Sequence, residues 1–419
     1  MISVPLLCFL SLLCFSVHGI TQRNLSHPGV VHGALWLIVS LGYFFFQSEL
    51  NHLSPQTIGT LILGIVMFSI GITLGALSPS LTSWSPPSVL GNIPLLAIIV
   101  GISAIGLAMM IFKAVEYAKA LEIWFTRPDG SITLIGSMSW IQMLRNELVL
   151  NHRGSFGTSS YVLNFCFAGV AYVILYFRRV RSTLWLWPLL ALALGFAVIS
   201  TGRTFILLLG CIVLGAVMST NPRKNYRVIA IAIFSGASAF FILAWMGGRL
   251  NLLSGGPAAN PFVAGVLQYF LMPMAAFDYL INADLPATWG ILTFRTPLAI
   301  VKAIGAPITV PDLIQPFVKV PSAINVYTVF SPYYRDFGMA GVATFMLFFG
   351  ALHGWVFRQL KTGMPIIIVA NALLFYALLM QFFQDQYFSL MSQWIQILFW
   401  TYLFNKLQPL PLIADHDKP

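Results

Sequence analysis

Long apolar runs separated by short polar links dominate the pattern of the chain. Each run is close to the roughly 17–25 residues that an α-helix needs to cross the hydrocarbon core of a bilayer. Because only helices and closed barrels satisfy backbone hydrogen bonds in lipid, the pattern predicts an all-α, polytopic integral membrane protein with about eleven transmembrane helices. The runs lie at roughly 1–19, 29–47, 56–77, 93–112, 161–179, 183–200, 203–219, 228–247, 337–358, 364–383 and 388–404.

The composition agrees with this class of protein. Of 419 residues, 58% are hydrophobic and only 8% are charged, which is more apolar surface than a soluble domain of this size can hide. We therefore expect a single integral membrane domain over residues 1–419. The first run has no Lys or Arg ahead of its apolar core, so we interpret it as a first span rather than a signal peptide.

The net charge of +10 raises the question of nucleic acid binding. The basic residues, however, lie in short loops between apolar runs, where they set the orientation of a membrane protein. No basic stripe with interleaved aromatic residues is present for stacking on bases. The sequence therefore predicts no nucleic acid partner.

Two long stretches contain no predicted transmembrane helix and form the large loops of the protein. They lie at about 113–160 and 248–336. Lys113–Lys119 has helical charge spacing and is predicted to continue the fourth span, and 139–150 reads as a short amphipathic helix. In the second loop, 261–282 is apolar yet contains Gln268 and Asp278, which predicts a re-entrant or interfacial segment. Prolines divide the rest of this loop into short pieces.

Clusters of basic residues in the short loops predict the orientation, with the N-terminus outside and the C-terminus inside. This topology places both large loops on the outer side. Ten of the twelve acidic residues and eleven of the 22 basic residues then fall outside, so we expect any chemistry to face outward. The orienting residues are Arg178, Arg179, Arg181, Arg223, Lys224, Arg227, Arg358 and Lys361.

Arg335 and Asp336 stand side by side just before the apolar run at 337–358. A charge in the middle of a membrane costs about 2.5–3.5 kcal/mol, so this pair should face protein, water or a ligand. Arg145, Arg203 and Arg295 are further arginines on the predicted outer side. Each guanidinium offers paired donors to phosphate, or instead extends to lipid headgroups. Four arginines on the same predicted side favour the binding of a polyanion such as a lipid-linked diphosphate.

Several other side chains are candidates for the chemistry of such a site. Asp278 lies among apolar residues, where burial would raise its pKa and suit it to proton transfer, although it is equally suited to pair with an arginine. Asp336 has the same two interpretations, with an ion pair to a nearby Arg favoured. His152 is either a base near neutral pH or a solvated loop residue. Tyr327, Tyr333 and Tyr334 could stack on sugar rings or belong to an interfacial aromatic belt.

Motifs for other kinds of chemistry are missing. The sequence has no GxxxxGK[ST] motif for ATP, no HExxH, and no metal-ligand spacing of Cys and His. An Asp-x-Asp pair occurs only at Asp415 and Asp417, in the C-terminal tail. We therefore expect metal-independent chemistry without a cofactor.

Several short motifs, taken in order, resemble those of the Wzy-type polymerases of bacterial surface polysaccharides, also called O-antigen or oligosaccharide repeat unit polymerases. Any one of them is weak, and their order and spacing carry the resemblance. The family often has Gly-Pro where this chain has Met272-Pro273. The motifs are Met143-Leu-Arg145, Ser200-Thr-Gly-Arg-Thr204, Met272-Pro-Met-Ala-Ala-Phe-Asp278, Thr293-Phe-Arg295, Val320-Pro-Ser-Ala-Ile-Asn-Val-Tyr327 and Ser331-Pro-Tyr-Tyr-Arg-Asp-Phe-Gly338.

The resemblance implies a multi-span glycosyltransferase of the bacterial inner membrane. Such an enzyme transfers a growing glycan from undecaprenyl diphosphate to a lipid-linked repeat unit on the periplasmic face. It implies an undecaprenyl-diphosphate-linked oligosaccharide, membrane lipid and a chain-length regulator protein as partners. In that activity the four arginines would hold diphosphates, with Arg335 stabilising the leaving group, and Asp278 or Asp336 would deprotonate the acceptor hydroxyl. Tyr333, Tyr334 and His152 would line the substrate-binding site.

Three alternatives remain open at this point. An O-antigen ligase binds the same lipid diphosphate but hands the glycan to the lipid A core. A transporter of polysaccharide or lipid-linked oligosaccharide would place charges near the middle of the bilayer in broken helices. A non-catalytic membrane partner would leave the outer arginines unexplained.

Overall fold

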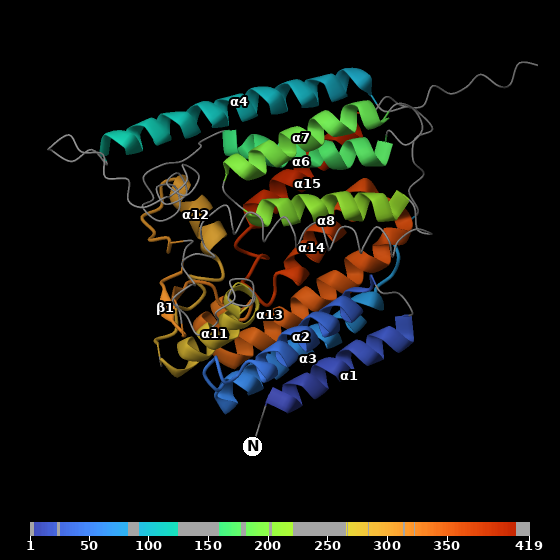
Figure 1. The fold of residues 1–419 in the computed structure, drawn as a ribbon. Coiled ribbons are helices and arrows are strands. Elements are labelled where there is room, and N and C mark those ends of the chain that lie inside the picture. Colours follow the sequence, from blue (N-terminus) through green and yellow to red (C-terminus); the bar gives the residue numbers. More distant parts are fainter. Residues whose placement is uncertain are drawn as a thin grey trace, which may run out of the picture. The chain divides into compact units, whose positions relative to one another are not determined.

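The computed structural model describes residues 4–22, 26–82, 92–124, 159–176, 182–200, 203–220, 265, 267–283, 285–312, 315–321 and 323–407. The chain is mostly helical and forms two compact units, each assembled from three stretches of sequence (Figure 1). Unit 1 comprises Met1–Leu81, Leu252–Lys361 and Leu374–Ser392, and unit 2 comprises Thr82–Asn251, Thr362–Leu373 and Gln393–Pro419. The prediction of one domain over the whole chain stays a prediction.

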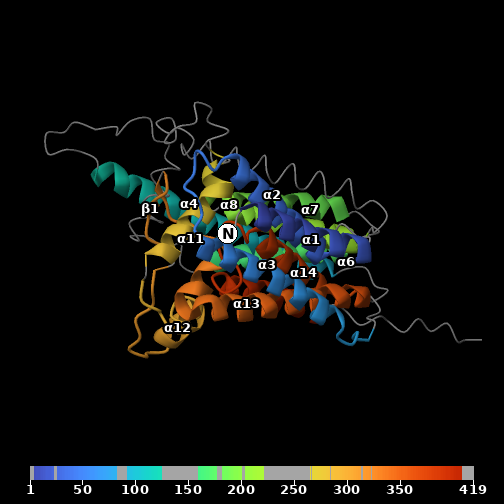
Figure 2. The same cartoon turned by 90° about the horizontal axis from the view of Figure 1, so that it is seen from below.

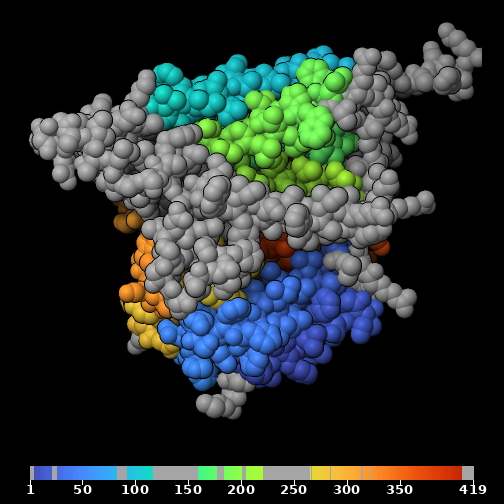
Figure 3. Space-filling model, viewed as in Figure 1, coloured from blue at the N-terminus to red at the C-terminus, as the bar shows by residue number. Residues whose placement is uncertain are grey.

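Unit 1 contains the N-terminal helices and the longest helix of the C-terminal half. Figures 1 and 2 place α11, α12 and β1 together at one end of this unit, and in Figure 3 the blue residues of α1 to α3 form one continuous face. A two-residue antiparallel ladder pairs β1 with β2. The elements are α1 (Val4–Gln22), α2 (Pro28–Phe45), α3 (Pro55–Ala76), the π-helical turn η4 (Leu267–Leu271), α11 (Met272–Asn282), α12 (Arg295–Ala303), β1 (Val318–Lys319), β2 (Ala323–Ile324), α13 (Ser331–Gln359) and the 3₁₀ turn η5 (Leu360–Thr362).

Unit 2 is built from apolar helices that pack on one another. Helix α6 contacts α4, α7 and α8, and Asn164 on α6 donates to Gln396 Oε1 on α15 at 3.1 Å. Helix α14 begins in unit 2 and ends in unit 1. The elements are α4 (Ile93–Trp124), α6 (Ser159–Tyr176), α7 (Ser182–Ile199), α8 (Arg203–Thr220), α14 (Pro365–Leu379) and α15 (Met391–Lys406).

The helices agree with the predicted all-α membrane class. Every predicted span outside 228–247 coincides with a helix, and 228–247 lies outside the described residues. In the part of the chain that the structure describes, five helices are long and apolar enough to cross a membrane: Pro28–Phe45, Pro55–Ala76, Ile93–Glu116, Ser159–Tyr176 and Ser331–Thr362. The count of eleven spans and the orientation stay predictions.

The structure bears on two local predictions for the loops. Lys113–Lys119 is helical, because α4 continues to Trp124, which confirms the extension of the fourth span. The part of the predicted re-entrant or interfacial segment that the structure describes, residues 267–282, forms η4 and α11, and the α11 residues Met272–Phe277 are buried inside unit 1. Whether this segment is re-entrant or interfacial stays a prediction.

The largest helix contact in the described part of unit 1 joins α3 to α13, and glycine makes it possible. Gly71 and Gly75 on α3 face Leu347 and Ala351 on α13. On the other side, Gly350 and Gly354 form a second G-x-x-x-G pair, which faces residues of α3. Helices associate closely in apolar surroundings where such small residues allow backbones to touch. The contact places successive turns of the two helices side by side in the same direction.

We expect Gly75→Ala to destabilise the protein by about 1–3 kcal/mol, because the added methyl group would overlap the carbonyl oxygen of Ala351. Gly59→Ala is the matched control on the same helix, since nothing lies within 4 Å of the position of its new methyl group. Thermal unfolding of the purified variants in detergent would measure the difference. Equal midpoints for the two variants would contradict the close backbone contact.

Helix α13 contains a break at Gly338 that reverses the chain. The backbone there has φ 63° and ψ −154°, a conformation that only glycine adopts without strain. Tyr333 stacks on Phe345 with ring centroids 4.8 Å apart. In a continuous helix these residues would be about 18 Å apart along the axis. Residues 331–337 therefore fold back along the longer part of the helix and form with it a helical hairpin.

The segment leading into this hairpin penetrates unit 1 to half the length of its helices. Phe330 stacks on Trp36 at 5.2 Å and touches Gly64, and both partners lie near the middle of their helices. The amide of Val329 donates to the carbonyl oxygen of Gln381 at 2.8 Å. Non-helical backbone at membrane depth is tolerated where it is buried in protein, and Val329 and Phe330 are fully buried. The segment just before the hairpin is thus packed inside unit 1.

Gln381 also organises a buried polar cluster beside this segment. Its Oε1 accepts from the Trp36 indole at 3.2 Å and from His32 Nδ1 at 2.9 Å. Its Nε2 donates to the Tyr387 hydroxyl at 3.0 Å, which lies 2.9 Å from His353 Nε2. The cluster therefore fixes the chain after α14 against α2 and α13.

We expect Gly338→Ala to cost about 1–3 kcal/mol, because an alanine is strained in this backbone conformation although the space around it is open. Gly305→Ala is the control, since Gly305 also has positive φ (103°) and open surroundings but lies after α12, outside the hairpin. Both variants should lose stability in a thermal unfolding assay. Only Gly338→Ala should also increase proteolytic cleavage between residues 320 and 338, and equal cleavage in the two variants would argue against a hairpin that depends on Gly338.

Candidate functional site

Asp336 lies in the hairpin and holds a turn of the neighbouring loop. Its carboxylate accepts a short hydrogen bond from Thr288 Oγ1, one from the Thr293 amide at 2.6 Å, and a longer one from the Leu292 amide at 3.4 Å. The side chain is fully buried. The ion pair favoured for Asp336 from sequence is therefore replaced by contacts to a hydroxyl and to backbone amides. The Asp336 carboxylate therefore holds residues 288–293 in place.

The anchored turn has an unusual backbone. Trp289 has φ 50° and Gly290 has φ 92°, and the Thr288 amide donates to the carbonyl oxygen of Arg335 at 3.1 Å. The turn leads directly into α12, because the Phe294 amide donates to the Gly290 carbonyl oxygen at 2.8 Å. The buried acid thus ties α12 to the hairpin.

Asp278 lies on α11 and caps the start of α3. Its Oδ1 accepts from the Ser54 amide at 2.7 Å, and its Oδ2 accepts from Asn282 Nδ2 at 3.1 Å. Ser54 is the N-cap of α3, and its hydroxyl accepts from the Thr57 amide. The Asp278 side chain is 9% exposed, and its carboxylate has fewer donors than that of Asp336. Of the two predicted bases, Asp278 is therefore less committed to hydrogen bonds within the protein.

Arg335 has an unused donor. Its Nε is buried and has no hydrogen-bond partner among the residues that the structure describes. The guanidinium lies close enough to Tyr327 to influence it electrostatically. Burial raises the pKa of Tyr327 to about 12, and the charge of Arg335 opposes that rise. The Tyr327 hydroxyl itself donates to the Pro316 carbonyl oxygen at 2.9 Å.

Arg295 is the first residue of α12 and is partly committed to the protein. Its Nε donates to the Pro311 carbonyl oxygen at 2.7 Å. Burial lowers the pKa of Arg295, and the carboxylate of Asp312 opposes that effect. The rings of Phe294, next to Arg295, and Phe337, two positions after Arg335, lie 6.5 Å apart, so these two stretches of chain are brought together.

The predicted sugar-stacking tyrosines differ in their surroundings. Tyr333 is fully buried, and its hydroxyl donates to Asp385 Oδ1 at 2.6 Å, so its ring offers no free face to a ligand. Tyr327 is buried as well. Tyr334 is half-buried and accepts from Gln56 Nε2 at 2.7 Å, with its ring edge-on to Phe277 at 5.8 Å. Of the three, Tyr334 alone remains accessible.

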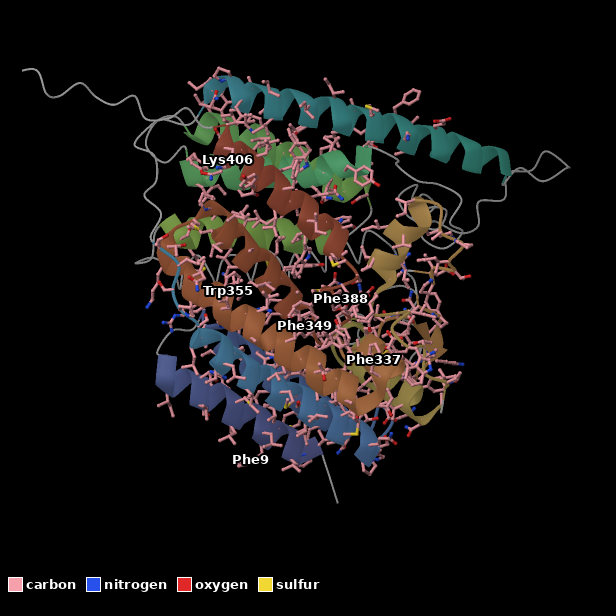
Figure 4. All side chains as sticks on the ribbon, turned by 180° about the vertical axis from the view of Figure 1, so that it is seen from behind. Phe9, Phe337, Phe349, Trp355, Phe388 and Lys406 are labelled. Atoms are coloured by element: carbon pink, nitrogen blue, oxygen red, sulfur yellow. The ribbon has the colours of Figure 1, made fainter. Side chains whose placement is uncertain are left out.

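Around Tyr333 the hairpin forms an aromatic cluster. Figure 4 shows Phe349 and Phe388 together, with Phe337 nearby. Phe349 stacks on Tyr387 with ring centroids 4.0 Å apart, and Phe388 lies 5.6 Å from Phe349. The cluster packs the hairpin against the chain between α14 and α15.

Asp385 is a half-buried acid that sequence reasoning did not select. Besides the Tyr333 hydroxyl, it accepts from the amides of Tyr387 at 3.0 Å and Ser389 at 3.1 Å. Burial raises the pKa of Asp385, and these hydrogen bonds oppose the rise. The signal in the sequence is an acid between two glutamines, Gln384 and Gln386, in a short link between apolar runs.

The other predicted site residues are not placed. Arg145 and His152 lie outside the described residues, and Arg203 begins α8 but its side chain also lies outside them. The predicted convergence of four guanidinium groups therefore stays a prediction. Within the described residues, no group of three or more His, Cys, Asp or Glu side chains is arranged to hold a metal ion.

Comparison with protein-family models, with curated proteins and with solved structures finds no match for this chain. The arguments about function therefore rest on the residues and their contacts.

We expect Asp336→Ala to destabilise the protein by about 2–4 kcal/mol, because it leaves two backbone amides and the Thr288 hydroxyl without their acceptor. Asp312→Ala, at an exposed position in the same loop region, is the control and should be nearly neutral. Thermal unfolding would measure the stability, and limited proteolysis would show cleavage near residues 288–293. An Asp336→Ala protein as stable as the control would refute the anchoring role.

Proposed function

We propose that the chain is a glycosyltransferase that polymerises a bacterial surface polysaccharide. It transfers a growing glycan from undecaprenyl diphosphate to a lipid-linked repeat unit, at the periplasmic face of the inner membrane. The observation that carries the proposal is Arg335, whose buried Nε has no partner among the described residues in the helical hairpin. A fixed guanidinium with an unused donor is suited to bind a diphosphate at the edge of the bilayer.

The reaction requires a positive charge beside the leaving group. The acceptor hydroxyl oxygen forms a bond to the anomeric carbon of the growing glycan, and the bond from that carbon to the diphosphate oxygen breaks. The electron pair of the broken bond remains on the diphosphate. We propose that Arg335 stabilises this negative charge, with Arg295, Arg145 and Arg203 holding the diphosphates.

The reaction also releases the proton of the acceptor hydroxyl. We propose Asp278 as the base, because its carboxylate has two donors whereas the buried Asp336 is committed to the 288–293 turn. Tyr334, whose ring contacts Phe277 beside Asp278, is suited to border the acceptor.

We expect Arg335→Ala to lower polymerisation about 100-fold or more, since the loss of one donor to a developing anion typically has this effect. Arg335→Lys should restore part of the activity, because it keeps the charge but not the paired donors. Lys319→Ala, at an exposed basic position on β1, is the control. The measurement is the length of surface polysaccharide in a deletion strain that produces each variant at the normal level.

Three results would contradict the proposal. Long chains in the Arg335→Ala strain would remove this residue from the mechanism. A deletion strain that still makes long chains would remove the activity itself. A deletion strain with no repeat unit on the lipid A core, rather than a single one, would indicate a ligase.

One observation favours a transporter of lipid-linked oligosaccharide as a second candidate. The cluster of His32, Gln381, Tyr387 and His353 lies deep in unit 1 beside a broken helix, and transporters place polar groups in such positions. The two activities differ in where precursor accumulates. Loss of transport would leave the repeat unit on the cytoplasmic side, whereas loss of polymerisation would leave it on the periplasmic side.

A further inference from the structure

Trp289 is held in an exposed and strained position. Its side chain is 81% exposed, and its backbone has φ 50°. A bulky aromatic residue rarely adopts a positive φ, and such strain persists only where surrounding contacts enforce it. Strained residues of this kind concentrate at functional sites.

The contacts that enforce this conformation come from the proposed active site. The residue before Trp289 is Thr288, which bonds to the Asp336 carboxylate through its hydroxyl and to the Arg335 carbonyl oxygen through its amide. After Trp289, the Leu292 and Thr293 amides donate to the same carboxylate. The turn that carries Trp289 is therefore tied to both charged residues of the hairpin.

The aromatic residues in the described segments around Arg335 differ in exposure. Tyr327 and Tyr333 are buried, and Tyr334 is half-buried. Phe294 and Phe337, which lie at Gly290 in the same turn, are 38% and 36% exposed. Tyr279, which lies near enough to Tyr327 to influence its hydroxyl, is 51% exposed. Trp289 and Tyr279 thus have the most exposed rings of this group.

We propose that Trp289 is the platform on which a sugar ring of the lipid-linked oligosaccharide stacks, with Tyr279 as a smaller second surface. The inference rests on the proposed function and adds the residue that binds the glycan beside the diphosphate. An indole offers a flat apolar face to the C–H groups of a pyranose ring. Because the turn is already fixed, binding orders little additional chain.

The competing explanation is that Trp289 anchors the protein in the lipid interface, where tryptophan is enriched. Leu285 and Ile291 near it are also exposed. An interfacial anchor, however, needs no strained backbone, whereas the Asp336 contacts hold this turn in a conformation that places Trp289 at φ 50°. A turn with a fixed backbone favours a ligand that binds in a defined orientation.

The test uses Trp289→Ala and Trp289→Phe in the full-length protein in lipid nanodiscs. The probe is the oligosaccharide released by mild acid from the polyprenyl-diphosphate pool of the host cells. We expect Trp289→Ala to weaken binding about 10-fold and Trp289→Phe to weaken it only slightly, because a phenyl ring keeps most of the stacking. Trp187→Ala, at a 68% exposed position on α7, should leave binding unchanged.

A second measurement separates sugar from lipid. The Trp289 fluorescence, obtained as the difference between the wild-type protein and Trp289→Phe, should change saturably with oligosaccharide and should not be quenched by brominated acyl chains. Quenching by these lipids without a response to oligosaccharide would overturn the proposal. Unaltered binding by a Trp289→Ala protein with a normal unfolding midpoint would overturn it as well.

Failure of this inference is distinguishable from failure of the polymerase activity. If Arg335→Ala abolishes polymerisation but Trp289→Ala leaves both binding and chain length unchanged, the activity stands and the platform is wrong. If deletion of the gene leaves long chains but binding still depends on Trp289, the platform stands and the activity is wrong.

Discussion

The hydrogen bond from the Val329 amide to the Gln381 carbonyl oxygen holds non-helical backbone inside unit 1. Unpaired backbone groups at membrane depth cost several kcal/mol each, so a segment that enters an apolar bundle must find partners there. Gln381 supplies one through its backbone and, through its side chain, joins His32, Trp36 and Tyr387. The buried segment around Val329 and the hairpin that follows it depend on this arrangement.

From that buried point the chain turns outward and then reverses at Gly338. The reversal presents Arg335 and Asp336 on a short helical piece rather than at the end of a long straight helix. The two neighbours then have opposite roles. Asp336 points into the protein and fixes the 288–293 turn, while Arg335 retains a donor without a partner among the described residues. Of these two neighbouring charged residues, Asp336 therefore has a structural role, and Arg335 is left for the proposed chemistry.

Much of the fold could be predicted because it follows from hydrophobicity alone. The apolar runs outside 228–247 coincide with helices, since length and composition decide which segments become helical in lipid. The hairpin could not be predicted, because a reversal at one glycine leaves the hydrophobic pattern of 331–359 unchanged. The role of Asp336 was equally hidden, because its partners Thr288 and Thr293 are more than forty positions away in the sequence. Arg335, Asp278 and Tyr334 were selected from sequence, whereas Asp385 and Trp289 emerged only from burial and backbone geometry.

The direct backbone contact between α3 and α13 has a consequence for how such a protein changes over evolutionary time. Gly71, Gly75, Gly350 and Gly354 leave no layer of side chains that could be repacked to shift one helix along the other. The α3 start, capped by Asp278, and the hairpin with Arg335 are consequently held at a constant separation. Under the proposed activity, new sugar preferences would therefore arise by sequence drift in the loop at 285–312, while the proposed acid and guanidinium stay in register.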